Sequence, residues 1–246
     1  MSRARLGDRP VEAVLFDYGL TLITYARPES ALRRAYERIA ALVGGDWDAG
    51  RLLDAVHDRV DARVAAHEAS GGLEEIDITA AHRDAYAGLG IRLDAATLDR
   101  AMHEEQVAWW EGIHVAPGAP EVLRTLRAEG LRLGICSNAP YRPASMREQL
   151  AHVGLAPLVD AAVFSAEVGW RKPAPEIFAA ALRALGARPE TTVHVGDRLR
   201  EDVDGAHAAG MRAVRLREHN DDHDVDDRAD AVIDRLGDLP QLLGLA

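Results

Sequence analysis

Six polar side chains stand at the ends of apolar segments or just ahead of a helical pattern, and together they offer a consistent set of chemical groups. They are Asp17, Ser137, Asn138, Lys172, Asp197 and Asp202. A carboxylate can attack phosphorus as a nucleophile, and further carboxylates can hold Mg²⁺, which prefers oxygen ligands. An ammonium and a hydroxyl can bind the phosphoryl oxygens. The residue types therefore indicate phosphoryl transfer.

Each of these residues alone also has a purely structural interpretation. An Asp after a strand is commonly a turn former, a Ser there can cap a helix, and a Lys is commonly a surface charge. The chemical interpretation requires that the fold bring the side chains together, so the question is which elements carry them.

The apolar segments and the helical patterns between them predict an α/β fold. The segments expected as strands are residues 11–16, 131–136, 161–164, 192–195, 213–216 and, more weakly, 231–233. The helical patterns cover residues 120–129, 142–152, 175–185 and 202–209, and each is followed by a glycine. Such alternation is typical of a parallel sheet in a three-layer, Rossmann-like core. Ligands bind there at the carboxyl ends of the strands, so the six polar residues are expected at one edge.

Residues 25–114 interrupt this alternation. Four helical patterns follow one another there, over residues 29–42, 48–69, 78–89 and 94–111. The sequence thus predicts an all-helical domain, residues 25–114, inserted into a discontinuous core of residues 1–24 and 115–246.

Composition excludes several classes of function. The chain has 246 residues and a net charge of −11, which disfavours non-specific binding to the phosphate backbone of nucleic acid. Apolar runs are far shorter than the roughly 18 residues of a membrane span, so no membrane association is expected. One cysteine, Cys136, cannot form an internal disulfide, and no signal peptide is recognisable at the N-terminus. We therefore expect a cytoplasmic protein, and the scarcity of lysine beside abundant alanine and arginine is typical of a GC-rich bacterial sequence.

The polar residues, in their order, resemble the four motifs of the haloacid dehalogenase-like hydrolase superfamily, with a cap domain inserted after the first motif. That motif, Asp-x-Asp-x-Thr, is matched by Asp17 and Thr21. Ser137 and Asn138 match the second motif, and Lys172, within a Lys-Pro-x-Pro-x-Ile-Phe segment, matches the third. Gly196-Asp197 followed by Asp202 matches the fourth. The resemblance covers nearly the whole chain.

The resemblance implies a role for each matched residue. Asp17 is then the nucleophile that becomes an aspartyl phosphate, and Ser137 and Lys172 act with it in catalysis. The phosphate-binding set is Thr21, Ser137, Asn138 and Lys172, and Mg²⁺ is held by Asp17, the backbone carbonyl of Gly19 and Asp197, with Asp202 in support. The substrate is expected to be a small phosphorylated molecule, and the protein a monomer or a homodimer.

The sequence departs from the family at one position, because Gly19 stands where family phosphatases carry an acid/base Asp. Loss of such a group typically costs ~10² to 10⁴ in rate. Two alternatives therefore stay open: a catalytically weak relative that binds a phosphorylated ligand or a protein partner, and a carbon–halogen hydrolase. A phosphonate-cleaving relative is disfavoured, because no lysine lies between Tyr25 and Val115 to form a Schiff base.

Two further patterns are less specific. Residues 218–227 are acidic and are expected as a solvated loop, although His219 and His223 beside Asp221, Asp222 and Asp224 offer metal ligands. Candidate substrate contacts of the cap are Tyr18, Tyr25, the turn at residues 71–75, Trp109 and Trp110, for each of which ordinary packing is the alternative.

Overall fold

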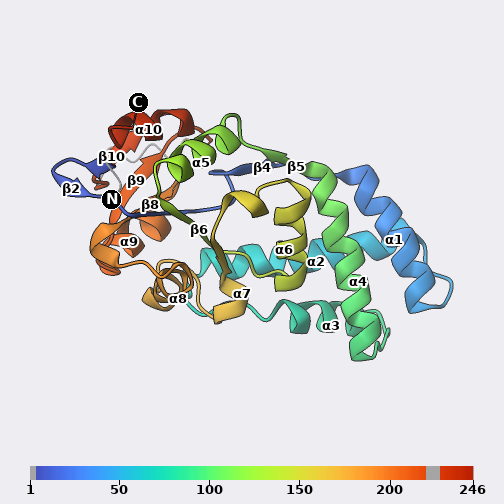
Figure 1. The fold of residues 1–246 in the computed structure, drawn as a ribbon. Coiled ribbons are helices and arrows are strands. Elements are labelled where there is room, and N and C mark those ends of the chain that lie inside the picture. The colour runs from blue at the N-terminus through green and yellow to red at the C-terminus, as the bar shows by residue number, and fades with distance from the viewer. Residues whose placement is uncertain (1–3, 220–227, 246) are drawn as a thin grey trace.

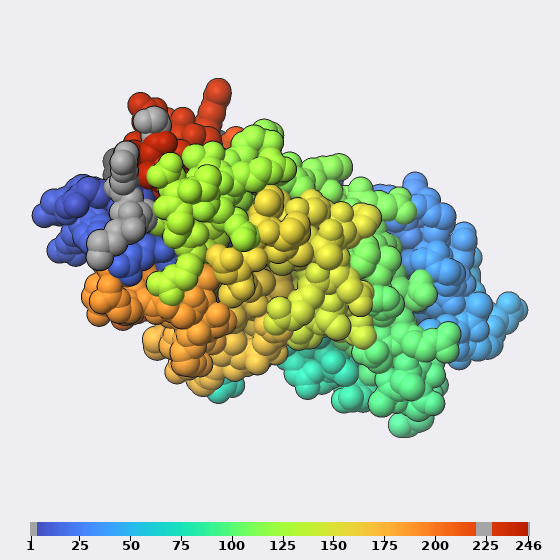
Figure 2. Space-filling view, viewed as in Figure 1, coloured from blue at the N-terminus to red at the C-terminus, as the bar shows by residue number. Residues whose placement is uncertain are grey.

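The computed structural model describes residues 4–219 and 228–245. His223 and the aspartates at 221, 222 and 224, which the sequence offered as metal ligands, lie outside the described residues. The molecule is elongated, with an α/β core at one end and a bundle of helices at the other (Figures 1 and 2). In the described part of the chain, no helix combines the length and the apolarity of a membrane span.

The core is built on a six-stranded sheet in which every neighbouring pair is parallel. Its strands are β3 (Ala13–Phe16), β6 (Arg132–Ser137), β7 (Ala161–Phe164), β8 (Thr192–Gly196), β9 (Arg212–Leu216) and β10 (Ala231–Ile233). Their order across the sheet is β10-β9-β8-β3-β6-β7. Numbered along the chain as 1 to 6, this is the 3-2-1-4-5-6 order of doubly wound folds, in which the first strand lies at the centre.

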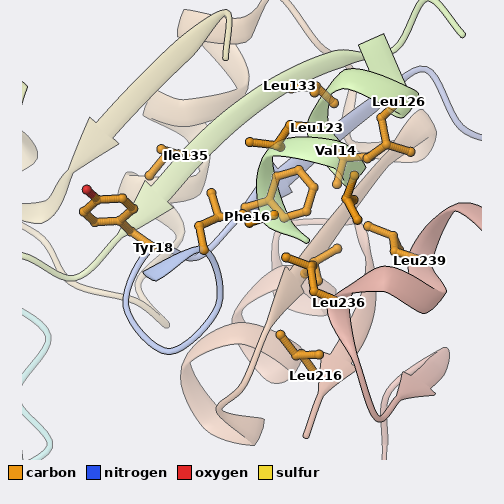
Figure 3. Packing of buried hydrophobic residues seen from close by; sticks show 14 of the residues in the cluster. Val14, Phe16, Tyr18, Leu123, Leu126, Leu133, Ile135, Leu216, Leu236 and Leu239 are labelled. Atoms are coloured by element: carbon orange, nitrogen blue, oxygen red, sulfur yellow. The ribbon is translucent and has the colours of Figure 1, made fainter. Parts of the chain in front are cut away.

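Side chains alternate between the two faces of the sheet, and each face carries its own apolar layer. Val14 and Phe16 of β3 point to one face, where α5 (Ala119–Ala128), α6 (Pro143–His152) and α10 (Leu239–Leu242) cover them (Figure 3). Ala13 and Leu15 point to the other face, covered by α8 (Pro175–Leu185) and α9 (Gly205–Ala208). Both faces are buried, so the strands are mainly apolar, with buried polar exceptions such as His194 of β8 and Arg215 of β9. The expected three-layer core is confirmed.

Four helices form the cap over residues that the sequence predicts as helical. They are α1 (Glu29–Val43), α2 (Ala49–Ala69), α3 (Ile78–Gly88) and α4 (Ala95–Ala108), followed by the 3₁₀ turn η1 (Trp109–Gly112). Asp48, Asp77 and Asp94 cap three of these helices by accepting from the backbone N–H three residues on. The helices share one apolar core that is separate from the layers of the sheet.

The chain passes between core and cap through two short antiparallel strands, β4 (Ile23–Tyr25) and β5 (Ile113–Val115). Ile23 pairs with Val115 and Tyr25 with Ile113, so the two crossings lie side by side. These two strands are not predicted from the sequence, because three-residue segments carry no resolvable periodicity.

Three other features also differ from expectation. An N-terminal hairpin, β1 (Arg5–Leu6) and β2 (Arg9–Pro10), precedes the sheet. A short helix, α7 (Ser165–Val168), follows β7. The helix expected over residues 202–209 is instead a π-helical turn, η4 (Leu199–Asp204), continuing into α9. π-helical turns are frequent at functional sites, and η4 carries Asp202.

Candidate active site

Three carboxylates converge where the order of the sheet reverses. Asp17 follows β3 and Asp197 follows β8, the two central strands, and the backbone N–H of Asp17 donates to the Val195 carbonyl at 2.8 Å. Asp202, from η4, completes the group, and each residue offers an oxygen that lies within 4.8 Å of the others. Asp197 and Asp202 are 1% exposed. Topological switch points are the usual ligand sites of such sheets.

Lys172 places its ammonium between two of these carboxylates. Its Nζ lies 2.8 Å from Oδ1 of Asp17 and 2.6 Å from Oδ1 of Asp202, and the side chain is buried. Burial alone would lower the pKa of Lys172, but the two carboxylates outweigh it and hold the pKa above its usual value. Lys172 is the only lysine in the sequence. The site therefore keeps one permanent positive charge at its centre.

Asp202 is fixed by contacts to both of its carboxylate oxygens. Oδ1 accepts from Lys172 and lies 2.9 Å from Nε2 of the buried His194, while Oδ2 accepts from the backbone N–H of Arg198 at 2.9 Å. A side chain at Gly196 would place its Cβ 2.2 Å from Cγ of Asp202, so only glycine allows this approach. Burial would raise the pKa of Asp202, but Lys172 and His194 outweigh it and keep the pKa low. Asp202 is thus an ionised carboxylate, and it orients the ammonium of Lys172.

Asn138 holds Lys172 in place through its side-chain amide. Its Oδ1 accepts from the Lys172 N–H at 2.7 Å, and its Nδ2 donates to the Lys172 carbonyl at 3.2 Å. The amide of Asn138, which is predicted to bind phosphate, is thus hydrogen-bonded to the backbone of Lys172. Ser137, at the end of β6, lines the open cavity described below. Burial raises the pKa of the adjacent Cys136 thiol to about 12, which makes that thiol inert.

A tight turn after β3 places Gly19 beside the carboxylates. The N–H groups of Leu22 and Ile23 both donate to the Tyr18 carbonyl, and that of Leu20 donates to the Ile23 carbonyl at 2.7 Å. Leu20 adopts a φ of 58°, a left-handed conformation that costs roughly 1–2 kcal/mol for a residue with a Cβ. Thr21 is fully buried and is not among the residues that line the cavity. Gly19 does line it.

Core and cap together enclose a cavity of about 420 Å³ at this edge of the sheet. The core contributes all three carboxylates, Lys172, Ser137 and Asn138 to its lining, and the cap contributes side chains from α2, α3 and α4. Of the candidate contacts, Tyr18, Tyr25 and Trp109 line the cavity. Trp110 instead packs on the His152 ring, with centroids 5.0 Å apart.

The cap is fastened to the core beside Lys172 by Arg171. The guanidinium contacts Glu68 at 2.7 Å and Glu75 at 3.1 Å, and the Arg171 N–H donates to the Leu73 carbonyl at 2.8 Å. The Glu75 N–H donates to the Gly169 carbonyl at 2.9 Å. We refer to these contacts between residues 68–75 and 169–171 as the latch. The predicted contact turn, residues 71–75, is part of it.

A second contact joins α4 of the cap to α6 of the core. Arg142 forms a bidentate pair with Asp99, with both N–O distances 2.7 Å, and Nδ1 of His103 lies 3.1 Å from the Ser145 hydroxyl. The two helices lie against each other in Figure 2. Core and cap are therefore joined at the strand crossings, at the latch and at this helix pair.

Comparison with known proteins identifies the family. The family model for haloacid dehalogenase-like hydrolases matches residues 11–210, and the chain belongs to this hydrolase family. It is 29% identical to a ribulose-1,5-bisphosphate 5-phosphatase of Halopiger xanaduensis over 94% of this chain and 98% of that protein. It is 35% identical to a glyceraldehyde 3-phosphate phosphatase of Methanopyrus kandleri, over 56% of this chain and 59% of that protein.

Solved structures show the same architecture. A HAD phosphatase from Thermococcus onnurineus is 28% identical with a TM-score of 0.59, over 95% of this chain and 98% of that one. A 2-haloacid dehalogenase from Pseudomonas syringae is 25% identical with a TM-score of 0.68, over the same shares of the two chains. These structural neighbours thus include one protein named as a phosphatase and one named as a dehalogenase.

Proposed function

We propose that the protein is a Mg²⁺-dependent phosphatase that hydrolyses a small phosphorylated molecule through an aspartyl phosphate at Asp17. The observation that carries this proposal is the convergence of three carboxylates and one ammonium on the same edge of the sheet. The phosphatase names of its relatives support it.

The donor set fits Mg²⁺. Three carboxylates whose oxygens lie within 4.8 Å of one another repel each other, and a divalent cation beside Lys172 would relieve that repulsion. Asp17 and Asp197 would hold the ion together with the Gly19 carbonyl, and Asp202 would support them. When bound, the ion neutralises phosphate charge and draws the phosphoryl group toward the nucleophile.

The chain's own residues account for the two chemical steps. A carboxylate oxygen of Asp17 attacks phosphorus, the bond to the leaving oxygen breaks, and Lys172 and Ser137 bind the equatorial oxygens. Water then attacks the phosphorus of the aspartyl phosphate, which releases inorganic phosphate and regenerates the carboxylate. Gly19 supplies no proton to the leaving oxygen and no base for the water, so a residue of the cap, solvent or the substrate itself must supply both.

The alternatives make different demands on the same residues. Carbon–halogen hydrolysis needs no cation, whereas the three carboxylates favour one. A catalytically inert relative would bind a phosphorylated ligand without turning it over. The test is release of inorganic phosphate from acetyl phosphate and aryl phosphates, with and without Mg²⁺, with 2-chloropropionate as the halogenated arm. Mg²⁺-dependent phosphate release supports the proposal, chloride release the dehalogenase, and binding without turnover the inert relative.

A further inference from the structure

One face of α2 forms a long wall of the cavity. The lining residues recur at spacings of three and one and thus lie along one side of the helix. They are His57, Val60, Asp61, Val64, Ala65 and Glu68. Glu68 contacts Arg171, the neighbour of Lys172, so this end of the wall lies near the phosphate-binding residues. Eleven residues at 1.5 Å each place His57 about 16 Å farther along the helix axis.

Apart from the exposed Asp61, the middle of this wall and the surfaces beside it are mainly apolar. Val60 and Val64 of α2 line the cavity with Met102 of α4, Ile78 of α3 and Met146 of α6, and all five are buried. These side chains offer no hydrogen bonds. A polyol or sugar phosphate placed among them would leave its hydroxyl groups unpaired, at a cost of about 1–3 kcal/mol for each buried group. The wall therefore favours a substrate with an apolar body.

The far end of the wall is polar again, and two of its atoms have no partner. Nε2 of His57 and the side-chain nitrogen of Gln106 are buried without a hydrogen bond to any described residue, and both side chains line the cavity. Nδ1 of His57 lies 2.8 Å from the Glu105 carboxylate, which accepts, so Nδ1 carries a proton and Nε2 is the ring nitrogen left for a ligand. Gln106 offers a donor. Buried polar groups in proteins are usually hydrogen-bonded, so these two atoms are available to a bound molecule.

Gly19 restricts the substrate from the opposite end. Because no carboxylic acid protonates the leaving oxygen, departure is fast only from an alcohol that is itself acidic, such as a phenol or an enol. Aromatic alcohols satisfy this requirement and also match the apolar wall. Two unrelated features, one in the core and one in the cap, thus select the same kind of molecule.

We propose that the substrate is a phosphate monoester of an acidic, aryl-type hydroxyl on an apolar body, with a hydrogen-bonding group at its far end that reaches Gln106 and His57. The inference rests on the proposed phosphatase activity and narrows it. Triose and pentose phosphates, the substrates in the names of the relatives, would occupy the carboxylate end and leave the apolar wall uncovered.

The test compares phosphorylated compounds that undergo the same hydrolysis but extend to different distances along the α2 wall. Acetyl phosphate, which is short and has an acidic leaving group, tests the phosphatase alone. Phenyl phosphate and 2-naphthyl phosphate then test the apolar wall, and 2-naphthyl phosphate carrying a 6-hydroxyl tests its far end. We expect KM to fall along this series by about tenfold for each ~55 Å² of additional apolar surface buried. Glyceraldehyde 3-phosphate is expected to react slowly.

A pair of variants tests the far end directly. Gln106→Leu removes an unpartnered buried amide, so folding is expected to be retained, while the preference for the hydroxylated naphthyl substrate falls roughly fivefold. Gln241→Leu makes the same change on an exposed face of α10 and is expected to alter nothing. Equal KM values for phenyl and naphthyl phosphates, a preference for the triose phosphate, or an unchanged preference in Gln106→Leu would overturn the inference. Failure of acetyl phosphate and all aryl phosphates to react would instead overturn the phosphatase.

Discussion

The ammonium of Lys172 donates a hydrogen bond of 2.6 Å to Asp202, and both side chains are almost completely buried. The pair sits against Asp17, so one positive charge faces two negative ones. Removal of one partner from a buried pair commonly costs about 3–5 kcal/mol, because the remaining charge keeps its desolvation penalty.

Replacing Lys172 with methionine is therefore expected to destabilise the metal-free protein by about 3–5 kcal/mol. Mg²⁺ should restore more stability to Lys172→Met than it adds to the wild type, because the variant has more uncompensated negative charge. Urea unfolding of both proteins, with and without Mg²⁺, measures this difference. An equal effect of Mg²⁺ on both proteins would show that Lys172 does not compensate the carboxylates.

The substitution Asp197→Asn is expected to weaken Mg²⁺ binding, because it removes a charged oxygen ligand and leaves the shape of the side chain almost unchanged. Calorimetric titration with Mg²⁺ measures the loss. Asp58→Asn, at an exposed carboxylate that pairs with Arg27 in the cap, is the matched control and should bind as the wild type does. An unchanged affinity in Asp197→Asn would remove this residue from the metal site.

Restoring an acid/base group through Gly19→Asp is expected to speed hydrolysis of poor leaving groups by up to ~10² to 10⁴. The site can accept the side chain: a Cβ at Gly19 would meet only Cε1 of Tyr25, at 3.4 Å, and Tyr25 is half exposed. Rates for a series of aryl and alkyl phosphates should depend steeply on leaving-group acidity in the wild type and weakly in the variant.

Gly19→Asn is the control, since it has nearly the same shape without a titratable proton. In the wild type we also expect a burst of leaving group before a slow steady state, with phosphate trapped on Asp17 after acid quenching. Brisk cleavage of alkyl phosphates by the wild type, with no gain in Gly19→Asp, would show that another residue supplies the proton.

Breaking the latch is expected to free the cap. In Arg171→Met the buried carboxylate of Glu75 loses its cation, and the radius of gyration measured by X-ray scattering should rise in the absence of ligand. Mg²⁺ with a phosphate mimic should compact the variant more than the wild type. Arg188→Met, which breaks an exposed pair with Glu12, should scatter as the wild type does. Identical curves for all three proteins in every ligand state would argue against a gating cap.

The cap is expected to become less stable as the pH rises. Nδ1 of His82 bonds to the Ile78 carbonyl, so Nε2, 3.6 Å from Glu105, carries a proton only in the imidazolium form. Burial lowers the pKa of His82, but Glu105 outweighs it and the pKa is raised. A raised pKa in the folded state adds stability that is complete below about pH 6.5 and is lost as the pH rises through the folded value.

Glu105→Gln removes the carboxylate that raises the pKa of His82. Comparison with the wild type therefore isolates the effect of that pKa shift on stability. Thermal unfolding between pH 5 and 9 should show that the stability difference between wild type and variant shrinks as the pH rises. A difference that is constant with pH would mean that Glu105 does not raise the pKa of His82.

Much of the fold follows from local pattern, because strands buried on both faces are mainly apolar. Residues 11–16 are predicted as a strand for this reason, the observed strand is Ala13–Phe16, and Asp17 is exceptional because it follows that apolar segment. The cap helices are predicted from their helical patterns alone. The places of Asp17, Ser137 and Asp197 at one edge of the sheet follow from parallel topology alone, whereas Lys172 lies in the loop between α7 and α8.

The contacts that tune the site could not be predicted in the same way. Arg171 and Glu75 are separated by 96 positions, and their pairing exists only once the cap has folded over the core. His194 looks like one more residue of a buried strand, and Asn138 looks like a free amide. Each acquires its role from a neighbour that tertiary structure supplies, so no periodicity or spacing in the sequence marks it.

The burial of Lys172 has a practical consequence, because this chain has no other lysine. The one side-chain primary amine of this sequence is thus the buried ammonium of the candidate active site. Arginine guanidinium groups stay protonated and do not react as amines do. Reductive methylation of the folded protein should therefore leave the side chains unmodified, and a label on Lys172 identifies molecules in which the candidate site has been exposed. Labelling of Lys172 can therefore be used to measure how readily the candidate site opens or the protein unfolds.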